Sequence, residues 1–197
     1  MTYIKRLVMK GFKSFARETV ITLDPNMNVI VGPNGSGKSN ITDALCFVLG
    51  RLSIKSIRAA KAAHLIFSGN EHYKGSNQAH VELVLDNSKK VFSLDNNEIS
   101  VKRIVNKNGQ GTYKINGETK TRQEVLELLS QAGIDPHGFN IILQGEIMQF
   151  VKMQPEERRK VIEEVAGISV YEMRKEKSLK ELERTDQRLK GFLKVIC

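Results

Sequence analysis

Gly32-Pro33-Asn34-Gly35-Ser36-Gly37-Lys38-Ser39 decides the fold, because it fits the G-x-x-x-x-G-K-[ST] phosphate-binding loop at every required position. Residues 27–31 before it (Met-Asn-Val-Ile-Val) predict a short buried strand. Apolar residues at helical spacing between positions 41 and 49 predict a helix that ends at Gly50. A strand, a glycine-rich loop and a helix in this order distinguish the motif from a chance match in a turn.

The residue types in this loop suit a polyphosphate. At Gly32, Gly35 and Gly37 the backbone carries no side chain, so it can wrap closely around phosphates and present N–H donors to them. The start of the predicted helix adds the positive end of its dipole. Lys38 is expected to reach the β- and γ-phosphates of ATP, and the Ser39 hydroxyl to bind Mg²⁺.

Composition places fewer limits on function than the motif does. The 197 residues carry a net charge of +9, which favours a polyanionic partner such as nucleic acid, although a generic basic surface explains the charge equally well. Cys46 lies on the apolar face of the predicted helix and Cys197 lies far from it, so neither a disulfide framework nor a zinc site is indicated. We see no signal peptide and no apolar run of membrane-spanning length, and we expect a cytoplasmic protein without membrane contact.

Around the loop, the sequence predicts antiparallel strands. Residues 3–9 and 18–23 predict a hairpin that lies beside the strand feeding the loop. Residues 51–61 are strongly basic with interleaved apolar residues, which is typical of a segment facing a partner or a phosphate. From residue 79 onward, alternating segments and the turn signal Asn116-Gly117 predict an antiparallel meander. These features favour an α/β P-loop ATPase with a mixed sheet and an added antiparallel β-subdomain.

The sequence predicts mainly helices in the second half of the chain. A capping box at residues 121–124 opens a helix to Gly133, residues 139–146 predict an apolar strand that runs into Gln144-Gly145, and Pro155 starts a helix that ends at Gly167. Residues 168–197 have an interrupted heptad seam, so we expect a truncated coiled coil. The predicted domains are 1–166, the ATPase part, and 167–197, the beginning of the coiled-coil arm.

One element of a complete ATPase is not evident in the sequence. No run of four apolar residues followed by Asp-Glu occurs after the loop, although such a carboxylate normally holds Mg²⁺ and positions water. The nearest segment is 83–86 (Leu-Val-Leu-Asp), which we interpret as a meander strand that ends in a turn. We therefore expect this chain to form half of a catalytic unit.

Taken together, four segments resemble the N-terminal half of the ABC-type ATPase head of the structural maintenance of chromosomes (SMC) family, of the prokaryotic type. They are Gly-Phe-Lys-Ser-Phe at 11–15, the loop with Asn40 at 32–40, Ile-Arg-Ala at 57–59, and Phe-Asn-Ile-Ile-Leu-Gln-Gly-Glu at 139–146. The phosphate loop alone is generic, whereas the first and last segments in this order are specific. The resemblance covers essentially the whole chain.

The resemblance implies roles for residues outside the loop. Gln144 is similar to the family's Q-loop glutamine, which contacts Mg²⁺ and the attacking water, and Arg58 to its arginine-loop residue near the phosphates. Lys13 and Ser14 match positions near the phosphates, although position alone would favour an ordinary solvated turn. The implied catalytic residues are Lys38, Gln144 and Arg58, and the implied metal ligands are Ser39 and Gln144. The implied nucleotide contacts are Lys13, Ser14, Gly32, Pro33, Asn34, Gly35, Ser36, Gly37, Lys38, Ser39, Asn40, Gln144 and, near the adenine, His64 and Ile66.

In this family a C-terminal half supplies the Walker B carboxylates and the signature motif, and it joins the N-terminal half through a long coiled coil and a hinge. Two heads then sandwich two ATP molecules, and a kleisin-type subunit and DNA bind. The resemblance implies an ATP-driven motor subunit of chromosome condensation, cohesion and segregation at the nucleoid, with the fragment inactive alone. Three alternatives stay open: a related DNA-repair or recombination ATPase, a small-molecule P-loop kinase, and a nucleotide-dependent interaction module without turnover.

Overall fold

The computed structural model describes residues 2–51, 62–134, 141–165 and 169–196. The chain divides into two compact units, 1–143 and 144–197, and each is described by itself. The predicted division between residues 166 and 167 falls in a segment outside the described residues, so that division stays a prediction.

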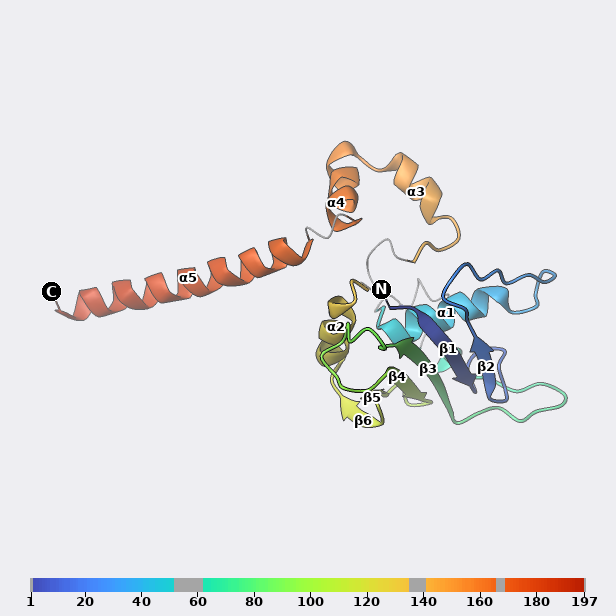
Figure 1. The fold of residues 1–197 in the computed structure, drawn as a ribbon. Helices are drawn as coiled ribbons and strands as arrows, with labels where there is room; N and C mark the ends of the chain where they lie inside the picture. The colour runs from blue at the N-terminus through green and yellow to red at the C-terminus, as the bar shows by residue number, and fades with distance from the viewer. Residues whose placement is uncertain (1, 52–61, 135–140, 166–168, 197) are drawn as a thin grey trace. The chain divides into compact units, whose positions relative to one another are not determined.

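A six-stranded sheet forms the first unit, with the strands in the order β2-β1-β3-β4-β5-β6 and every neighbouring pair antiparallel (Figure 1). The strands are β1 (Ile4–Lys10), β2 (Thr19–Thr22), β3 (Gln78–Asp86), β4 (Glu98–Asn106), β5 (Gly111–Ile115) and β6 (Glu118–Lys120). The predicted hairpin and meander are both confirmed. Asn116 (φ 48°) and Gly117 (φ 88°) form the turn between β5 and β6, as the two-residue hairpin signal predicts.

The position of the hairpin differs from the prediction. β1 pairs with β3 of the meander, in a register that sets Leu7 opposite Leu83 and Met9 opposite Val81. These four side chains are at most 1% exposed, so the two strands share one buried face. Hairpin and meander therefore form one sheet, and the expectation that the hairpin lies beside a strand feeding the loop is wrong.

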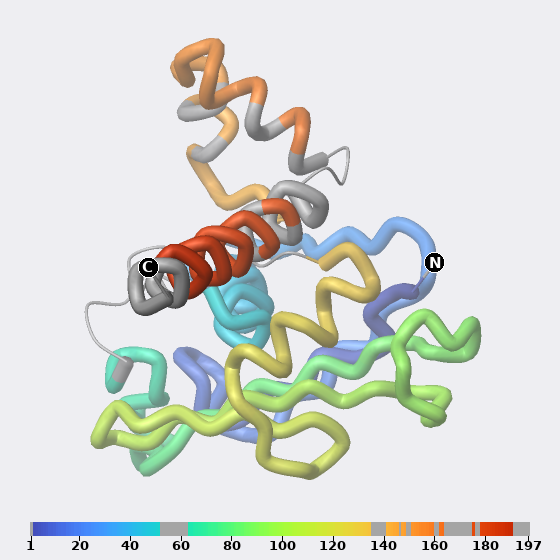
Figure 2. The backbone as a smooth tube through the Cα atoms, turned by 90° about the vertical axis from the view of Figure 1, so that its left-hand side faces the viewer, coloured from blue at the N-terminus to red at the C-terminus, as the bar shows by residue number. Residues whose placement is uncertain are grey.

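Two helices cover the buried face of this sheet, α1 (Lys38–Leu49) and α2 (Arg122–Gln131) (Figure 2). A short 3-10 helix, η2 (Ala62–Leu65), adds Leu65 to the same core. Phe47 and Cys46 of α1 and Leu129 of α2 are buried in a single hydrophobic cluster with the inner face of the sheet. The prediction that Cys46 is a core residue is confirmed, and the core anchors the helix that follows the phosphate loop.

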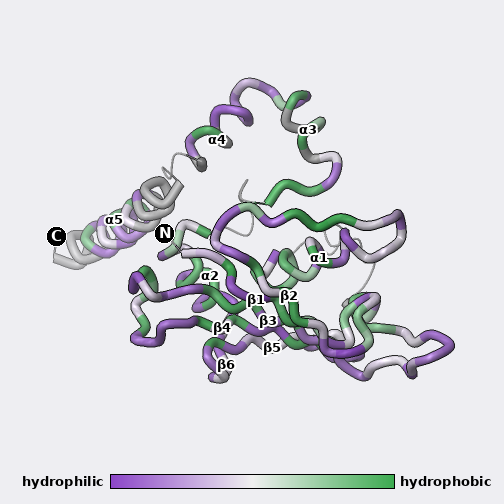
Figure 3. Tube along the Cα trace, turned by 45° about the vertical axis from the view of Figure 1, so that its right-hand side comes forward, coloured by the Kyte–Doolittle hydropathy of each residue, from purple (hydrophilic) through white to green (hydrophobic). Residues whose placement is uncertain are grey.

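Residues 27–31 do not form the predicted buried strand. They have no regular structure, and Met27, Val29 and Val31 are 89%, 73% and 83% exposed. Figure 3 shows their hydrophobic colouring in the connection between β2 and α1. A strand needs neighbours that satisfy its backbone groups and cover its side chains, and no strand of the described part of the chain pairs with this segment.

Helices make up the described part of the second unit: α3 (Glu146–Lys152), α4 (Pro155–Val165) and α5 (Ser169–Ile196). α4 begins at Pro155 as predicted, whereas residues 141–145 form no strand and the rest of that predicted strand, 139–140, lies outside the described residues. α5 has 28 residues and is about 42 Å long. Leu179, Leu182 and Leu189 are 49–67% exposed along it, as in an unpaired coiled-coil seam. Across the described ranges, no helix is both long and apolar enough to span a membrane.

Candidate nucleotide-binding site

The phosphate loop has the backbone geometry that the motif predicts. Gly35 (φ 82°) and Gly37 (φ 94°) lie in the left-handed region, which favours glycine. A Cβ atom added at Gly37 would lie 3.2 Å from Ser14 Oγ, so there is little room for a side chain at this point. Residues 32–36 are exposed, and Gly37 is the N-cap of α1. The loop is thus a strongly curved, accessible backbone segment that leads directly into a helix.

The N-terminus of α1 differs from that of α2. At α2, a capping box is complete: the Glu124 N–H donates to Thr121 Oγ1 at 3.3 Å, and the Thr121 N–H donates to Glu124 Oε2 at 2.7 Å. At α1, by contrast, no side chain among the described residues caps the helix, and its first turn holds no acidic residue. The N–H groups and the positive dipole end of α1 therefore suit an external anion.

Lys38 brings a cation into the loop. Its Nζ donates hydrogen bonds to the carbonyl oxygens of Gly32 (2.5 Å) and Pro33 (2.6 Å), so the ammonium group lies within the curve of the backbone. Ser39 follows it in the first turn of α1 and is exposed. A hydroxyl group at this point is a suitable hard ligand for Mg²⁺ beside a bound phosphate.

A tight turn brings Lys13 and Ser14 to the same end of α1. The turn is closed by hydrogen bonds in both directions between the backbones of Phe12 and Phe15, and the Phe12 ring is fully buried 5.3 Å from the Phe47 ring. Ser14 Oγ accepts a hydrogen bond from Asn40 Nδ2 at 2.8 Å. Lys13, with a left-handed backbone (φ 45°), forms an ion pair with Asp43 on the next turn of α1.

Asp43 is a residue of this site that the sequence did not predict. Its carboxylate is only 2% exposed, and it lies four residues after Ser39 on α1. Helical spacing sets Asp43 on the side opposite Ile41 and Leu45, so nothing in the sequence signalled its burial or paired it with a lysine thirty positions earlier.

Four predicted site residues remain, and three of them, His64, Ile66 and Gln144, belong to the described part of the chain. His64 is exposed on η2, whereas the Ile66 side chain is 6% exposed and packs in the core next to Phe12. Arg58 lies outside the described residues. Gln144 is exposed and belongs to the second unit, whereas the loop belongs to the first. The roles predicted for these four residues stay predictions.

Two arginines hold the opposite end of α1. Arg103 Nη1 donates to the Phe47 carbonyl oxygen at 2.8 Å, and Arg122 Nη2 donates to the Gly50 carbonyl oxygen at 3.0 Å. The Arg103 guanidinium also lies over the rings of Phe47 and Tyr113. Burial lowers the pKa of Arg103 and raises that of Tyr113, but a guanidinium stays charged at neutral pH. Positive charge at a helix C-terminus is favourable, so both ends of α1 are fixed.

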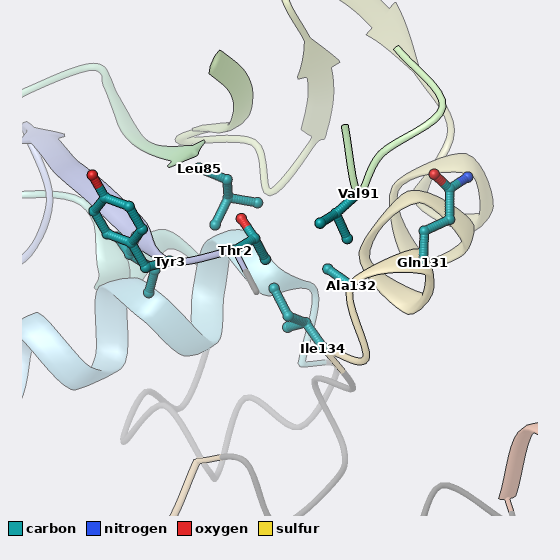
Figure 4. Close-up of a pocket in the computed structure, with 8 residues that line it drawn as sticks. Thr2, Tyr3, Leu85, Val91, Gln131, Ala132 and Ile134 are labelled. Carbon is teal, nitrogen blue, oxygen red and sulfur yellow. The ribbon is translucent and has the colours of Figure 1, made fainter. Parts of the chain in front are cut away.

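A cavity of about 390 Å³ in the first unit is a different feature (Figure 4). Its lining contains no acidic residue, histidine or cysteine and none of the predicted nucleotide contacts. The lining residues are Thr2, Tyr3, Ile4, Leu85, Val91, Gln131, Ala132 and Ile134. We therefore assign the candidate site to the loop and not to this cavity.

The chain is similar to proteins of known sequence and structure. The chain is 43% identical to the chromosome partition protein Smc of Pyrococcus furiosus over 190 residues. The aligned residues make up 96% of this chain and 16% of that protein. The chain therefore spans about one sixth of the length of that relative. The crystal structure of the P. furiosus Smc head domain, bound to the C-terminal domain of ScpA, matches 96% of this chain and 48% of that chain with a TM-score of 0.84 and 43% identity.

A second solved structure matches this chain over nearly the whole of its own length. It belongs to a structural study of the ATP-driven dimerization and DNA-stimulated activation of SMC ATPases. It matches 83% of this chain and 99% of that chain, with a TM-score of 0.77 and 42% identity. The family model described as "RecF/RecN/SMC N terminal domain" matches residues 3–182. The chain therefore belongs to the RecF/RecN/SMC N-terminal domain family.

Proposed function

We propose that this chain is the nucleotide-binding half of an SMC-type ATPase head, which binds Mg-ATP in the 32–39 loop. The observation that carries the proposal is the exposed, strongly curved loop that opens onto the uncapped N-terminus of α1 with Lys38 inside it. The backbone N–H groups and Lys38 would neutralise the phosphates, and Lys13 and Ser14 would approach them from the neighbouring turn.

The same proposal assigns the metal. Ser39, by its hydroxyl, and Gln144, by its carboxamide oxygen, would hold Mg²⁺, which supplies positive charge to the phosphates when bound. Gln144 would also orient the attacking water, and Arg58 would add a cation near the phosphates. His64 and Ile66 would lie near the adenine.

A second polypeptide segment would complete the catalytic unit. Asp86, at the end of the most Walker B-like stretch, is buried at the end of β3 and accepts a hydrogen bond from Ser88 Oγ at 2.6 Å, so it does not resemble a metal ligand. The exposed apolar residues 27–31 have the composition of a central strand. We propose that the C-terminal half of the same protein pairs with this segment and supplies the catalytic carboxylates.

The proposed partners follow from the relatives. Because the similar P. furiosus head binds the C-terminal domain of ScpA, and because ATP drives dimerization of SMC ATPases in the second study, we propose a kleisin-type subunit and a second head as partners here. The exposed leucines of α5 support a coiled-coil arm. The cellular role would be DNA organisation for chromosome condensation, cohesion and segregation at the nucleoid, and the net charge of +9 supports DNA contact.

ATP turnover tests the proposal. Turnover is measured with this chain alone, with the C-terminal half alone and with the mixture, each with and without DNA. We expect activity only in the mixture, stimulation by DNA, and loss of activity in Lys38→Ala. Robust turnover by this chain alone would contradict the half-site argument and would favour a kinase-like unit with a complete set of catalytic groups.

A further inference from the structure

We propose that Asp43 is a positioning residue for nucleotide binding, which holds the Lys13 ammonium beside the N-terminal half of α1 so that Lys13 can donate to the phosphate chain. The inference rests on the proposed function, because it concerns the same phosphate site. It assigns to Asp43 a role that the motif does not contain.

Burial prevents Asp43 from acting on a ligand directly. The residue is 2% exposed and lies four residues after Ser39, which is about 6 Å further along the helix axis. A carboxylate in this environment needs a compensating charge, and Lys13 provides one. Because the Lys13 side chain is itself only 12% exposed, its ammonium is confined to a small region beside α1.

The backbone of the turn limits where Lys13 can go. Its N–H donates to the Leu65 carbonyl oxygen at 2.8 Å, and the neighbouring Phe12 is fixed in the core. Ser14, the next residue, contacts Asn40, one helical turn before Asp43. The turn is thus attached to α1 at two successive levels, through Ser14 near the loop and through Lys13 below it.

The chemistry of an ammonium group allows both contacts at once. It carries three N–H donors, so one can remain on Asp43 while another reaches a phosphate oxygen. The carboxylate would then reduce the conformational freedom that Lys13 loses when it binds the ligand, which strengthens binding without a new contact. Lys13 becomes a second, pre-oriented cation in addition to Lys38.

A double-mutant cycle in ATP affinity tests this role. We compare wild type, Asp43→Asn, Lys13→Met and the double variant by calorimetric titration with Mg-ATP. We expect Lys13→Met to weaken ATP binding by on the order of tenfold, since it removes a charge-assisted hydrogen bond to the phosphates. Asp43→Asn should weaken binding by up to the same factor, because it leaves the Lys13 side chain to be ordered when ATP binds. The double variant should bind no more weakly than Lys13→Met, because Asp43 acts through Lys13. Lys13→Arg should retain most of the affinity.

The control is Asp86→Asn, which neutralises another buried carboxylate of the same unit, 8% exposed, and should leave ATP affinity unchanged. ATP affinity in Asp43→Asn equal to wild type, or a double variant in which the two losses multiply, would overturn the inference. If Asp43→Asn does not fold, the double variant removes both charges together, and weaker ATP binding by the double variant than by Lys13→Met would still overturn the inference. Failure of wild type to bind ATP would instead overturn the proposed function, and this inference with it.

Discussion

Replacement of Gly37 by alanine tests whether the close approach of the loop to Ser14 matters. The matched control is Gly109→Ala in the turn between β4 and β5. Both glycines have positive φ (94° and 83°), but an added Cβ would meet Ser14 Oγ at 3.2 Å at Gly37 and nothing within 4 Å at Gly109. The two substitutions thus share the backbone strain and differ in the steric contact.

The magnitudes follow from these two terms. An alanine in the left-handed conformation destabilises the folded state by about 1–2 kcal/mol. Alanine also restricts the unfolded chain, which stabilises the protein by about 0.4–1 kcal/mol. Gly109→Ala should therefore lower the free energy of unfolding by about 1 kcal/mol. Gly37→Ala adds the displacement of Ser14 and loss of its hydrogen bond from Asn40, about 1 kcal/mol more. The total of about 2 kcal/mol corresponds to a fall in Tm of roughly 4–8 °C for a chain of this size.

Urea unfolding and ATP titration measure both consequences. We expect Gly37→Ala to be the less stable variant and to bind ATP weakly, because the displaced Ser14 and loop no longer match the phosphates. Gly109→Ala should bind ATP like wild type. Equal free energies of unfolding for the two variants, together with wild-type ATP affinity in Gly37→Ala, would show that the close approach of Gly37 to Ser14 affects neither stability nor binding.

Three further predictions concern the sheet, the apolar segment and DNA. Burial raises the pKa of Glu82, but hydrogen bonds from Ser100 and Lys102 outweigh it and leave the pKa lowered. The ionised carboxylate therefore stabilises the fold above its unfolded-state pKa of about 4.3, and this contribution is lost as the pH falls further. Chemical unfolding at pH 7 and pH 4 should show a smaller loss in Glu82→Gln than in wild type, and an equal loss would contradict the assignment. Val31→Asp, at an 83% exposed position, should change the free energy of unfolding by less than about 0.5 kcal/mol yet abolish association with the C-terminal half in size-exclusion chromatography. Retained association would exclude the 27–31 segment from the interface. DNA affinity should fall steeply with salt, with a slope of about 0.9 per phosphate contact in a plot of log K against log [salt], and a flat response would exclude electrostatic binding.

Local signals in the sequence predicted much of the first unit. The loop, α1, the meander with its Asn116-Gly117 turn, and the capping box of α2 each depend on residues close together in the chain, so their patterns are sufficient. The core position of Cys46 follows from helical periodicity in the same way. Each of these structural predictions is confirmed, whereas nucleotide binding by the loop stays a prediction.

Features that depend on distant residues could not be predicted. The Val-Ile-Val pattern at 29–31 indicates a need for burial but not whether a neighbouring strand is present, and here the segment is exposed. The pairing of β1 with β3 joins residues seventy or more positions apart, which hairpin signals do not report. The ion pair between Lys13 and Asp43 depends on the left-handed turn at Lys13 and on its docking against α1.

If the 32–39 loop at the N-terminus of α1 is a nucleotide site, it must bind a nucleoside triphosphate and depend on Lys38 to do so. The most direct measurement is calorimetric titration of the protein with Mg-ATP, for wild type, for Lys38→Ala and for Lys107→Ala as a control lysine in the turn after β4. We expect saturable binding to wild type and Lys107→Ala, and a loss of at least tenfold in Lys38→Ala. Absence of saturable binding to wild type, or unchanged affinity in Lys38→Ala, would contradict this expectation.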